Sequence, residues 1–386
     1  MTPAARLQAA IEVLDAVLPG GPAERELTAW GRRSRFAGSK DRAAVRDHVF
    51  DALRRLRSSA WLGGLGDVPP EAMTGRAVIA GLLRGQGTDP APLFDGSRYG
   101  PAPLEDAPLP PPLEDAPEGV RFDVPDWLLP DLHASLGDRI EPVCEALRHR
   151  APIHLRANLA RTSRDDLVAA LAETGFDVRP HPLSPSAVEV AAPARGLAAS
   201  DAFAAGLFEM QDAASQAVVD RLPLEPGMRV LDLCAGGGGK ALAMAARMPL
   251  SLTAHDAAPE RMRDLPARAG RAGAEVTITE RPEDDSPFDL VLCDVPCSGS
   301  GAWRRQPEAR WRLTSDRLAE LKATQTAILA RAAALVRPGG HVALVTCSVL
   351  DGERWGAAEG LRERSRWASL PDDGADGLSL QLLARS

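Results

Sequence analysis

The chain has 386 residues, enough for two or three domains of ordinary size. Apolar residues make up 45% of it and charged residues 25%, which excludes a disordered chain, a collagen-like fibre and a coiled-coil rod. Five cysteines are too few for a disulfide scaffold, and neither they nor the seven histidines show metal-ligand spacing, so we expect no metal. Because we find neither an apolar run of membrane-spanning length nor a signal peptide, we expect a soluble, cytoplasmic monomer.

The net charge of −8 comes from 45 basic and 53 acidic residues that are unevenly distributed. Residues 31–57 hold nine basic residues against three acidic ones, and residues 303–312 hold four arginines against one glutamate. Such patches permit a polyanionic partner despite the net charge. Solvated helix faces explain residues 31–57 equally well.

The N-terminal part of the chain reads as helices followed by a linker. Leu7, Ile11, Leu14 and Leu18 recur at helical spacing, and a second stripe starts at Val45, so we expect an all-α domain over residues 1–85. Residues 86–120 are rich in proline and acid, and they contain the hexapeptide PLEDAP twice, at 103–108 and 112–117. That composition predicts an extended linker or long loop.

The rest of the chain predicts two further parts. Residues 121–205 begin with helices and continue as strand, helix and strand, which indicates a helical connector and a small α+β subdomain. Residues 206–386 alternate apolar runs of strand length with helical stretches. This alternation is typical of an α/β domain with a mostly parallel, doubly wound sheet.

A glycine-rich loop follows the first strand of the α/β domain. VLDLCAGGGGK places four glycines between Asp232 and Lys240, and the next strand ends at Asp256. Glycines at such a strand end let the backbone approach a ligand, and a carboxylate on the next strand can bind ribose hydroxyls. The pattern fits NAD, FAD or S-adenosylmethionine. An acid before the loop and the lack of a dinucleotide fingerprint favour S-adenosylmethionine.

Two cysteines end two further strands of this domain. FDLVLCDVPCSGSG contains Cys297 and HVALVTCSVL contains Cys347, each followed by a serine. In a parallel sheet both lie at the edge that carries the glycine loop. Two thiols beside a methyl donor suit methylation of cytosine carbon 5, because a thiolate added to carbon 6 makes carbon 5 nucleophilic. One thiol would add and the other would assist elimination, while Asp294 could hydrogen-bond the edge of the base.

These segments together resemble the Sun/Fmu (RsmB-like) family of RNA cytosine-C5 methyltransferases. DLCAGGGGK is similar to the family's D-x-C-A-A-P-G-G-K, DVPCSGSG to D-A-P-C-S-x-x-G, and TCSV to its T-C-S motif. FEMQDAASQ at 208–216, LRAN at 155–158 and PDWLL at 125–129 match further landmarks. GSKDRAAVRDHVFDALRR resembles the NusB-like RNA-binding domain of the bacterial 16S rRNA member.

The resemblance implies a class I, Rossmann-like methyltransferase domain and a role for each matching residue. Cys347 would be the nucleophile, Cys297 would promote product release, and Asp294 would lie between the cofactor and the base. S-adenosylmethionine would be held by the loop and by acids and an arginine nearby, namely Cys234, Ala235, Gly236, Gly237, Gly238, Gly239, Lys240, Asp256, Arg261, Glu280 and Asp294. Lys240, Arg304 and Arg305 would contact RNA, expected to be 16S rRNA.

Some positions depart from the family pattern. Gly237 replaces the proline of the loop and Ala241 replaces a threonine, so we expect a more flexible loop and weaker cofactor binding. The family's adenine-side acid aligns with Glu280 or with Asp284. Two alternatives remain open: a relic that binds rRNA without chemistry, and a DNA cytosine methyltransferase. The second fits poorly, since such enzymes need no T-C-S cysteine.

Overall fold

The computed structural model describes residues 1–104, 109–191 and 195–386, and it divides into two compact units. The first unit consists of Met1–Arg150 together with Trp303–Thr314, and the second of Ala151–Ala302 together with Ser315–Ser386. Residues 303–314 thus leave the second unit in sequence and pack with the first. None of the described helices is both long enough and apolar enough to cross a membrane.

The first unit is helical, as the sequence predicts. Thr2 caps its first helix by accepting a hydrogen bond from the backbone of Ala5, and Pro3 occupies the first helical position. The apolar stripes of the first and third helices pack into one core that includes Leu14 and Val49. The helices of this unit are α1 (Pro3–Val17), α2 (Ala23–Arg33), α3 (Ser39–Arg54), α4 (Leu56–Leu62), α5 (Gly75–Gly85), α6 (Glu118–Phe122), α7 (Leu129–Leu136), α8 (Ile140–Leu147) and α14 (Pro307–Arg312).

The region between α5 and α6 contains only short single turns among its described residues. The first PLEDAP copy falls partly outside the described residues, whereas the second ends just before α6. The structure groups residues 121–150 with the N-terminal helices, although the sequence analysis joined them to the α+β subdomain. A buried polar network explains this grouping, because Asp123 accepts hydrogen bonds from Ser58 and Arg148.

A small antiparallel sheet opens the second unit. Its strand order is β2-β3-β1-β4, and α9 and α10 contribute to the core on one of its faces. Ser163 caps α9 by accepting a hydrogen bond from the backbone of Asp166, and Gly175 follows the end of the helix with a positive φ of 89°. The elements are β1 (Ile153–Ala157), α9 (Arg164–Glu173), β2 (Val178–Pro180), β3 (Ala187–Val190), α10 (Asp201–Ala204) and β4 (Phe208–Met210).

The large sheet of the second unit confirms the predicted α/β domain. Its order is β10-β11-β9-β8-β5-β6-β7; β5 to β9 are parallel, and β10 and β11 pair antiparallel at one edge. The strands are β5 (Arg229–Asp232), β6 (Ser251–Ala254), β7 (Thr277–Ile278), β8 (Phe288–Asp294), β9 (Val336–Thr346), β10 (Leu361–Ser369) and β11 (Leu378–Arg385). The helices are α11 (Ala213–Asp220), α12 (Gly239–Ala245), α13 (Leu265–Ala272), α15 (Ser315–Leu335) and α16 (Asp351–Arg354).

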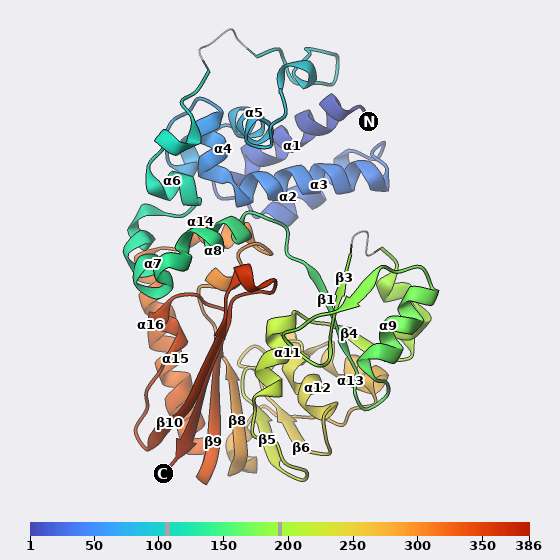
Figure 1. Cartoon of the computed structure of the whole chain (residues 1–386), viewed down its shortest axis with the longest axis vertical. Coiled ribbons are helices and arrows are strands. Elements are labelled where there is room, and N and C mark those ends of the chain that lie inside the picture. The colour runs from blue at the N-terminus through green and yellow to red at the C-terminus, as the bar shows by residue number, and fades with distance from the viewer. Residues whose placement is uncertain (105–108, 192–194) are drawn as a thin grey trace. The chain divides into compact units, whose positions relative to one another are not determined.

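Helices cover both faces of this sheet (Figure 1). Alternate residues of β8 face opposite ways, so Leu290 and Leu292 pack with α11 and α12, whereas Val291 packs with α15. Strands that are buried on both faces consist of continuous apolar runs, and such runs are what the sequence of this domain shows. Because β5, β8 and β9 run parallel to one another, their carboxyl ends lie at the same edge of the sheet.

Candidate active site

The two strand-end cysteines lie side by side. Because β8 and β9 are parallel neighbours, the segments that follow them run together, and the Sγ atoms of Cys297 and Cys347 are 3.3 Å apart. Both side chains are half-buried. The Cys347 contact and burial raise the pKa of Cys297 well above its ordinary value. A protonated Cys297 can donate a hydrogen bond to the Cys347 sulfur.

The carboxylate of Glu353 joins the two cysteine segments. Ser298, the residue after Cys297, donates to it from its backbone N–H at 2.8 Å and from its hydroxyl at 2.5 Å. Ser348, the residue after Cys347, donates its hydroxyl at 2.6 Å, and Gln325 of α15 donates at 3.1 Å. Glu353 is 2% exposed, so four donors compensate one buried charge. This arrangement fixes the spacing of the two thiols.

The glycine loop forms the floor of a cleft of about 310 Å³ beside these strand ends. Gly238 begins α12 with a φ of +77°, and a Cβ there would come within 2.2 Å of the Leu265 side chain. Only glycine suits that position. The lining residues predicted from the sequence are Cys234, Ala235, Gly236, Gly237, Gly239, Lys240, Arg261 and Asp294.

Asp232 places a buried carboxylate in the same cleft. It is 1% exposed, and within the described part of the chain neither of its oxygens has a hydrogen-bond partner. Burial, together with the nearby charges of Asp294 and Asp256, raises its pKa to about 7, although Lys240 and the Ala241 amide offset part of the shift. A cationic ligand in the cleft would compensate this carboxylate.

Lys240 and Asp294 form an ion pair at the junction of the cleft and the cysteines. Lys240 Nζ lies 2.6 Å from Asp294 Oδ2, and Lys240 is 8% exposed. Burial alone would lower the pKa of Lys240, but the Asp294 carboxylate raises it above its ordinary value. Lys240 therefore carries a positive charge at neutral pH. It fixes the Asp294 carboxylate, whose side chain remains about one third exposed.

The two remaining acids predicted to bind the cofactor, Asp256 and Glu280, lie in different surroundings. Asp256 is buried beneath the loop, where it accepts a hydrogen bond from Gly236 at 2.8 Å and pairs with Arg261 at 3.1 Å. Glu280 is exposed and does not line this cleft. Of the remaining cysteines, Cys144 and Cys293 are buried, as expected for packing residues.

The residues predicted to contact RNA belong to different units of the structure. Lys240 belongs to the second unit, whereas Arg304 and Arg305 belong to the first. Arg304 is 4% exposed and its carbonyl accepts from Arg54, so its burial counts against a contact with phosphate. Arg305 is exposed. In the basic segment 31–57 the exposed side chains include Arg32, Arg33, Arg35 and Lys40, whereas Arg54 and Arg57 are buried.

Sequence reasoning missed three polar residues that shape the loop. The buried Arg156 of β1 donates to the Gly239 carbonyl at 2.6 Å and to the side chain of Gln211. Arg268 of α13 donates to the Gly237 carbonyl and lines the cleft. Arg156 and Gln211 lie within the landmarks LRAN and FEMQDAASQ, so a signal existed. Arg268 had none, because it reaches the loop from a helix 31 residues away.

Comparison with known families finds two matches, both after residue 123. The family described as "16S rRNA methyltransferase RsmB/F" matches residues 219–383, and its "ferredoxin-like domain" matches residues 124–195. Ribosomal RNA small subunit methyltransferase B of Xanthomonas campestris is 35% identical over 263 residues, and that of Salmonella arizonae is 32% identical over 269 residues. These matches cover 65% and 68% of the chain but only 60% and 62% of the relatives.

Solved structures share the fold at low sequence identity. PH0851 aligns over 100% of this chain and 99% of its own, with a TM-score of 0.72 and 21% identity. A methyltransferase homolog protein from Pyrococcus horikoshii aligns over 72% of this chain and 100% of its own, with a TM-score of 0.62 and 22% identity. NSun6 from the same organism, solved with SFG, aligns over 68% of this chain and 98% of its own, with a TM-score of 0.59 and 16% identity.

The buried Glu353 network predicts a local loss of stability in Glu353→Gln. The substitution replaces a carboxylate that accepts four hydrogen bonds with an amide whose NH₂ group faces the same donors. We expect the segments around Cys297 and Cys347 to open more easily by about 2 kcal/mol, which is roughly a thirtyfold faster amide exchange. Hydrogen–deuterium exchange measures it. The exposed Glu359 provides the control, Glu359→Gln, and equal exchange in both variants would contradict the network.

Proposed function

We propose that the protein methylates carbon 5 of a cytosine in RNA, because residues 124–195 and 219–383 match the RsmB/F methyltransferase family. We propose 16S rRNA as the substrate and the cytoplasm as the place of action, because the sequence relatives are named ribosomal RNA small subunit methyltransferases. The observation that carries the proposal is the 3.3 Å separation of the Cys297 and Cys347 sulfurs.

Each thiol has a distinct part in the proposed reaction. The Cys347 thiolate adds to carbon 6 of the cytosine, which makes carbon 5 nucleophilic. After methylation, carbon 5 loses its proton and the bond between carbon 6 and the Cys347 sulfur breaks. Cys297 assists this elimination from 3.3 Å away. Asp294, oriented by Lys240, hydrogen-bonds the edge of the base and favours protonation of nitrogen 3, which stabilises the adduct.

The cleft residues fit S-adenosylmethionine. When bound, this cofactor supplies the methyl group. The uncompensated carboxylate of Asp232 would attract its positive charge, and the backbone of residues 234–239 would approach it closely. Asp256 would hold the ribose only by sharing a carboxylate that already binds Gly236 and Arg261.

The RNA must present an unstacked cytosine to reach the thiols. We propose that exposed basic side chains, including Arg305 and the group at Arg32, Arg33, Arg35 and Lys40, bind its phosphates. Such binding weakens as salt rises, because phosphate contacts release counterions. The likeness of the helical unit to the NusB fold and the monomeric state stay predictions.

The proposed roles of the thiols predict a trapped covalent complex in Cys297→Ala. Its adduct forms through Cys347 but is not eliminated, so unmodified 16S rRNA should give a slow, nuclease-sensitive band on a denaturing gel. Wild-type protein should turn over and give little band. Cys347→Ala should give none, because it lacks the nucleophile. Sequencing the trapped RNA would locate the cytosine.

Cys144→Ala, which alters a buried thiol of the first unit, is the matched control and should behave as wild type. A band in Cys347→Ala alone would exchange the two roles. No band in any variant, with cofactor binding intact, would favour a protein that binds RNA without chemistry. An adduct with cytosine-containing DNA in preference to RNA would contradict the proposed substrate.

The raised pKa of Asp232 predicts a pH dependence of cofactor binding. In the free protein this carboxyl has a pKa of about 7, and a bound cation stabilises its ionised form. Below pH 7 the ligand must displace a proton, so affinity should fall up to tenfold for each pH unit. Above pH 7 this group should add no further change.

Titration calorimetry with S-adenosylmethionine at several pH values measures this dependence. In Asp232→Asn the fall below pH 7 should flatten and the affinity at pH 8 should decrease. Asp316→Asn, at an exposed acid outside the cleft, is the control. An unchanged pH profile in Asp232→Asn would assign the dependence to another group.

A further inference from the structure

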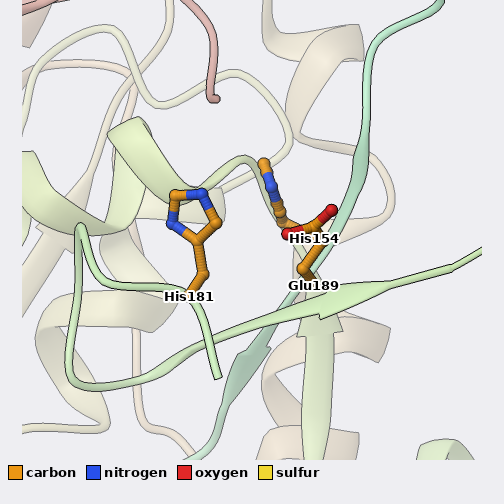
Figure 2. Close-up of side chains that lie close together, drawn as sticks. All are labelled: His154, His181 and Glu189. Atoms are coloured by element: carbon orange, nitrogen blue, oxygen red, sulfur yellow. The ribbon is translucent and has the colours of Figure 1, made fainter. Parts of the chain in front are cut away.

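Three potential metal ligands converge in the small antiparallel sheet. His154 of β1 and Glu189 of β3 are directly paired across neighbouring strands, and His181 follows β2. One ligand atom from each lies within 4.8 Å of those of the other two (Figure 2). The two imidazole rings are 4.7 Å apart between centroids. The reaction described above uses none of these residues.

His154 supplies an independent sign of a ligand. It is 3% exposed, and its Nε2 atom has no hydrogen-bond partner within the described part of the chain. Its other nitrogen, Nδ1, accepts a hydrogen bond from the backbone N–H of Ala213 at 3.2 Å and also lies 3.2 Å from Asp212 Oδ2. In the tautomer protonated at Nδ1, the ring donates to Asp212 instead and Nε2 carries a bare lone pair. A buried polar atom of this kind costs free energy unless something binds it.

This combination is that of a metal-binding histidine. Imidazoles that ligate a metal through one nitrogen usually donate from the other to a carboxylate, as His154 can to Asp212. Two histidines and one carboxylate are a common zinc ligand set, with water in the fourth position. We propose that His154, His181 and Glu189 bind one Zn²⁺ ion.

The geometry requires only a small closure. Zinc bonds of about 2.1 Å hold ligand atoms roughly 3.4 Å apart in a tetrahedron, against the upper limit of 4.8 Å here. His181 follows the edge strand β2, where its ring can adjust. Its Nδ1 now accepts a long hydrogen bond of 3.4 Å from Leu183. Glu189 pairs with the exposed Arg179 at 2.9 Å, a surface ion pair that contributes little and leaves carboxylate lone pairs for the metal.

The ion would fasten the small sheet to the methyltransferase domain. Its ligands come from β1, from β3 and from the segment after β2. Asp212, which contacts Nδ1 of the ligand His154, caps α11 by accepting a hydrogen bond from the backbone of Ala214. Asp212 also accepts from the backbone of Asp376, near the C-terminal strand. A zinc ion here would therefore act as a structural clamp within the second unit.

The test uses the full chain without a histidine tag, stripped with a chelator and then loaded with Zn²⁺ alone. We expect one tightly held zinc per chain by elemental analysis and a rise of about 5 °C in the thermal unfolding midpoint. His181→Gln and Glu189→Gln should each weaken zinc binding at least tenfold. Glu189 is only half-buried, so Glu189→Gln should fold even if His154→Gln does not.

Two controls decide where the metal binds. Glu145 of α8 and His149, which follows that helix, form an exposed pair 2.8 Å apart, so His149→Gln tests adventitious surface binding and should keep the zinc. The thiols of Cys297 and Cys347 can also bind zinc, so the measurement is repeated in Cys297→Ser/Cys347→Ser, which should retain one ion. Bound Co²⁺ should then show visible d–d absorption without thiolate charge-transfer bands.

Zinc lost with the two thiols but kept in His181→Gln would place the metal at the active site and overturn the proposal. Binding no tighter in wild type than in His181→Gln would overturn it as well. These outcomes do not depend on methyl transfer, because each readout is metal content, absorption or unfolding temperature.

Discussion

The structure of the site depends on one buried carboxylate. Parallel pairing of β8 and β9 brings Cys297 and Cys347 to the same edge, but pairing alone ends at Asp294 and Val345. Beyond that point the two segments are irregular, and Glu353 holds both by binding the serines that follow the cysteines. Because a buried charge must be compensated, the four donors and the carboxylate form as a unit. Together with the hydrogen bond from the Gly301 N–H to the Cys347 carbonyl at 2.9 Å, this unit holds the two thiols 3.3 Å apart.

The charges of the cleft divide into two groups with different tasks. Lys240 pairs with Asp294 at 2.6 Å and fixes the position of that carboxylate. Asp232 has no such partner, and its raised pKa makes it sensitive to any cation that enters. The two acids end adjacent strands but have different surroundings. Asp294 has a lysine at 2.6 Å, whereas Asp232 is buried. A cationic methyl donor and a neutral base suit these two environments.

The sequence predicted the features that local pattern determines. The strands ending at Asp232, Asp294 and Thr346 are apolar runs, and the residues that follow them must meet at one edge, so the cysteines and the glycine loop could be placed together. Burial of a basic residue has no such signal: Arg304 reads as a surface arginine until it packs among helices. No sequence signal marked the proposed zinc ligands either. Positions 154 and 189 meet through the register of β1 with β3, and position 181 reaches them because β2 pairs with β3.

That register also explains why the small sheet matters for chemistry carried out on the large one. His154 and Arg156 are two residues apart on β1, so both project from the same face, opposite to the core that contains Leu155. Arg156 holds the Gly239 carbonyl at the start of α12, while His154 contacts Asp212 at the start of α11. The sheet therefore grips both helices at the end nearest the cofactor cleft. A metal at His154 would stiffen this connection between the small sheet and the two helices.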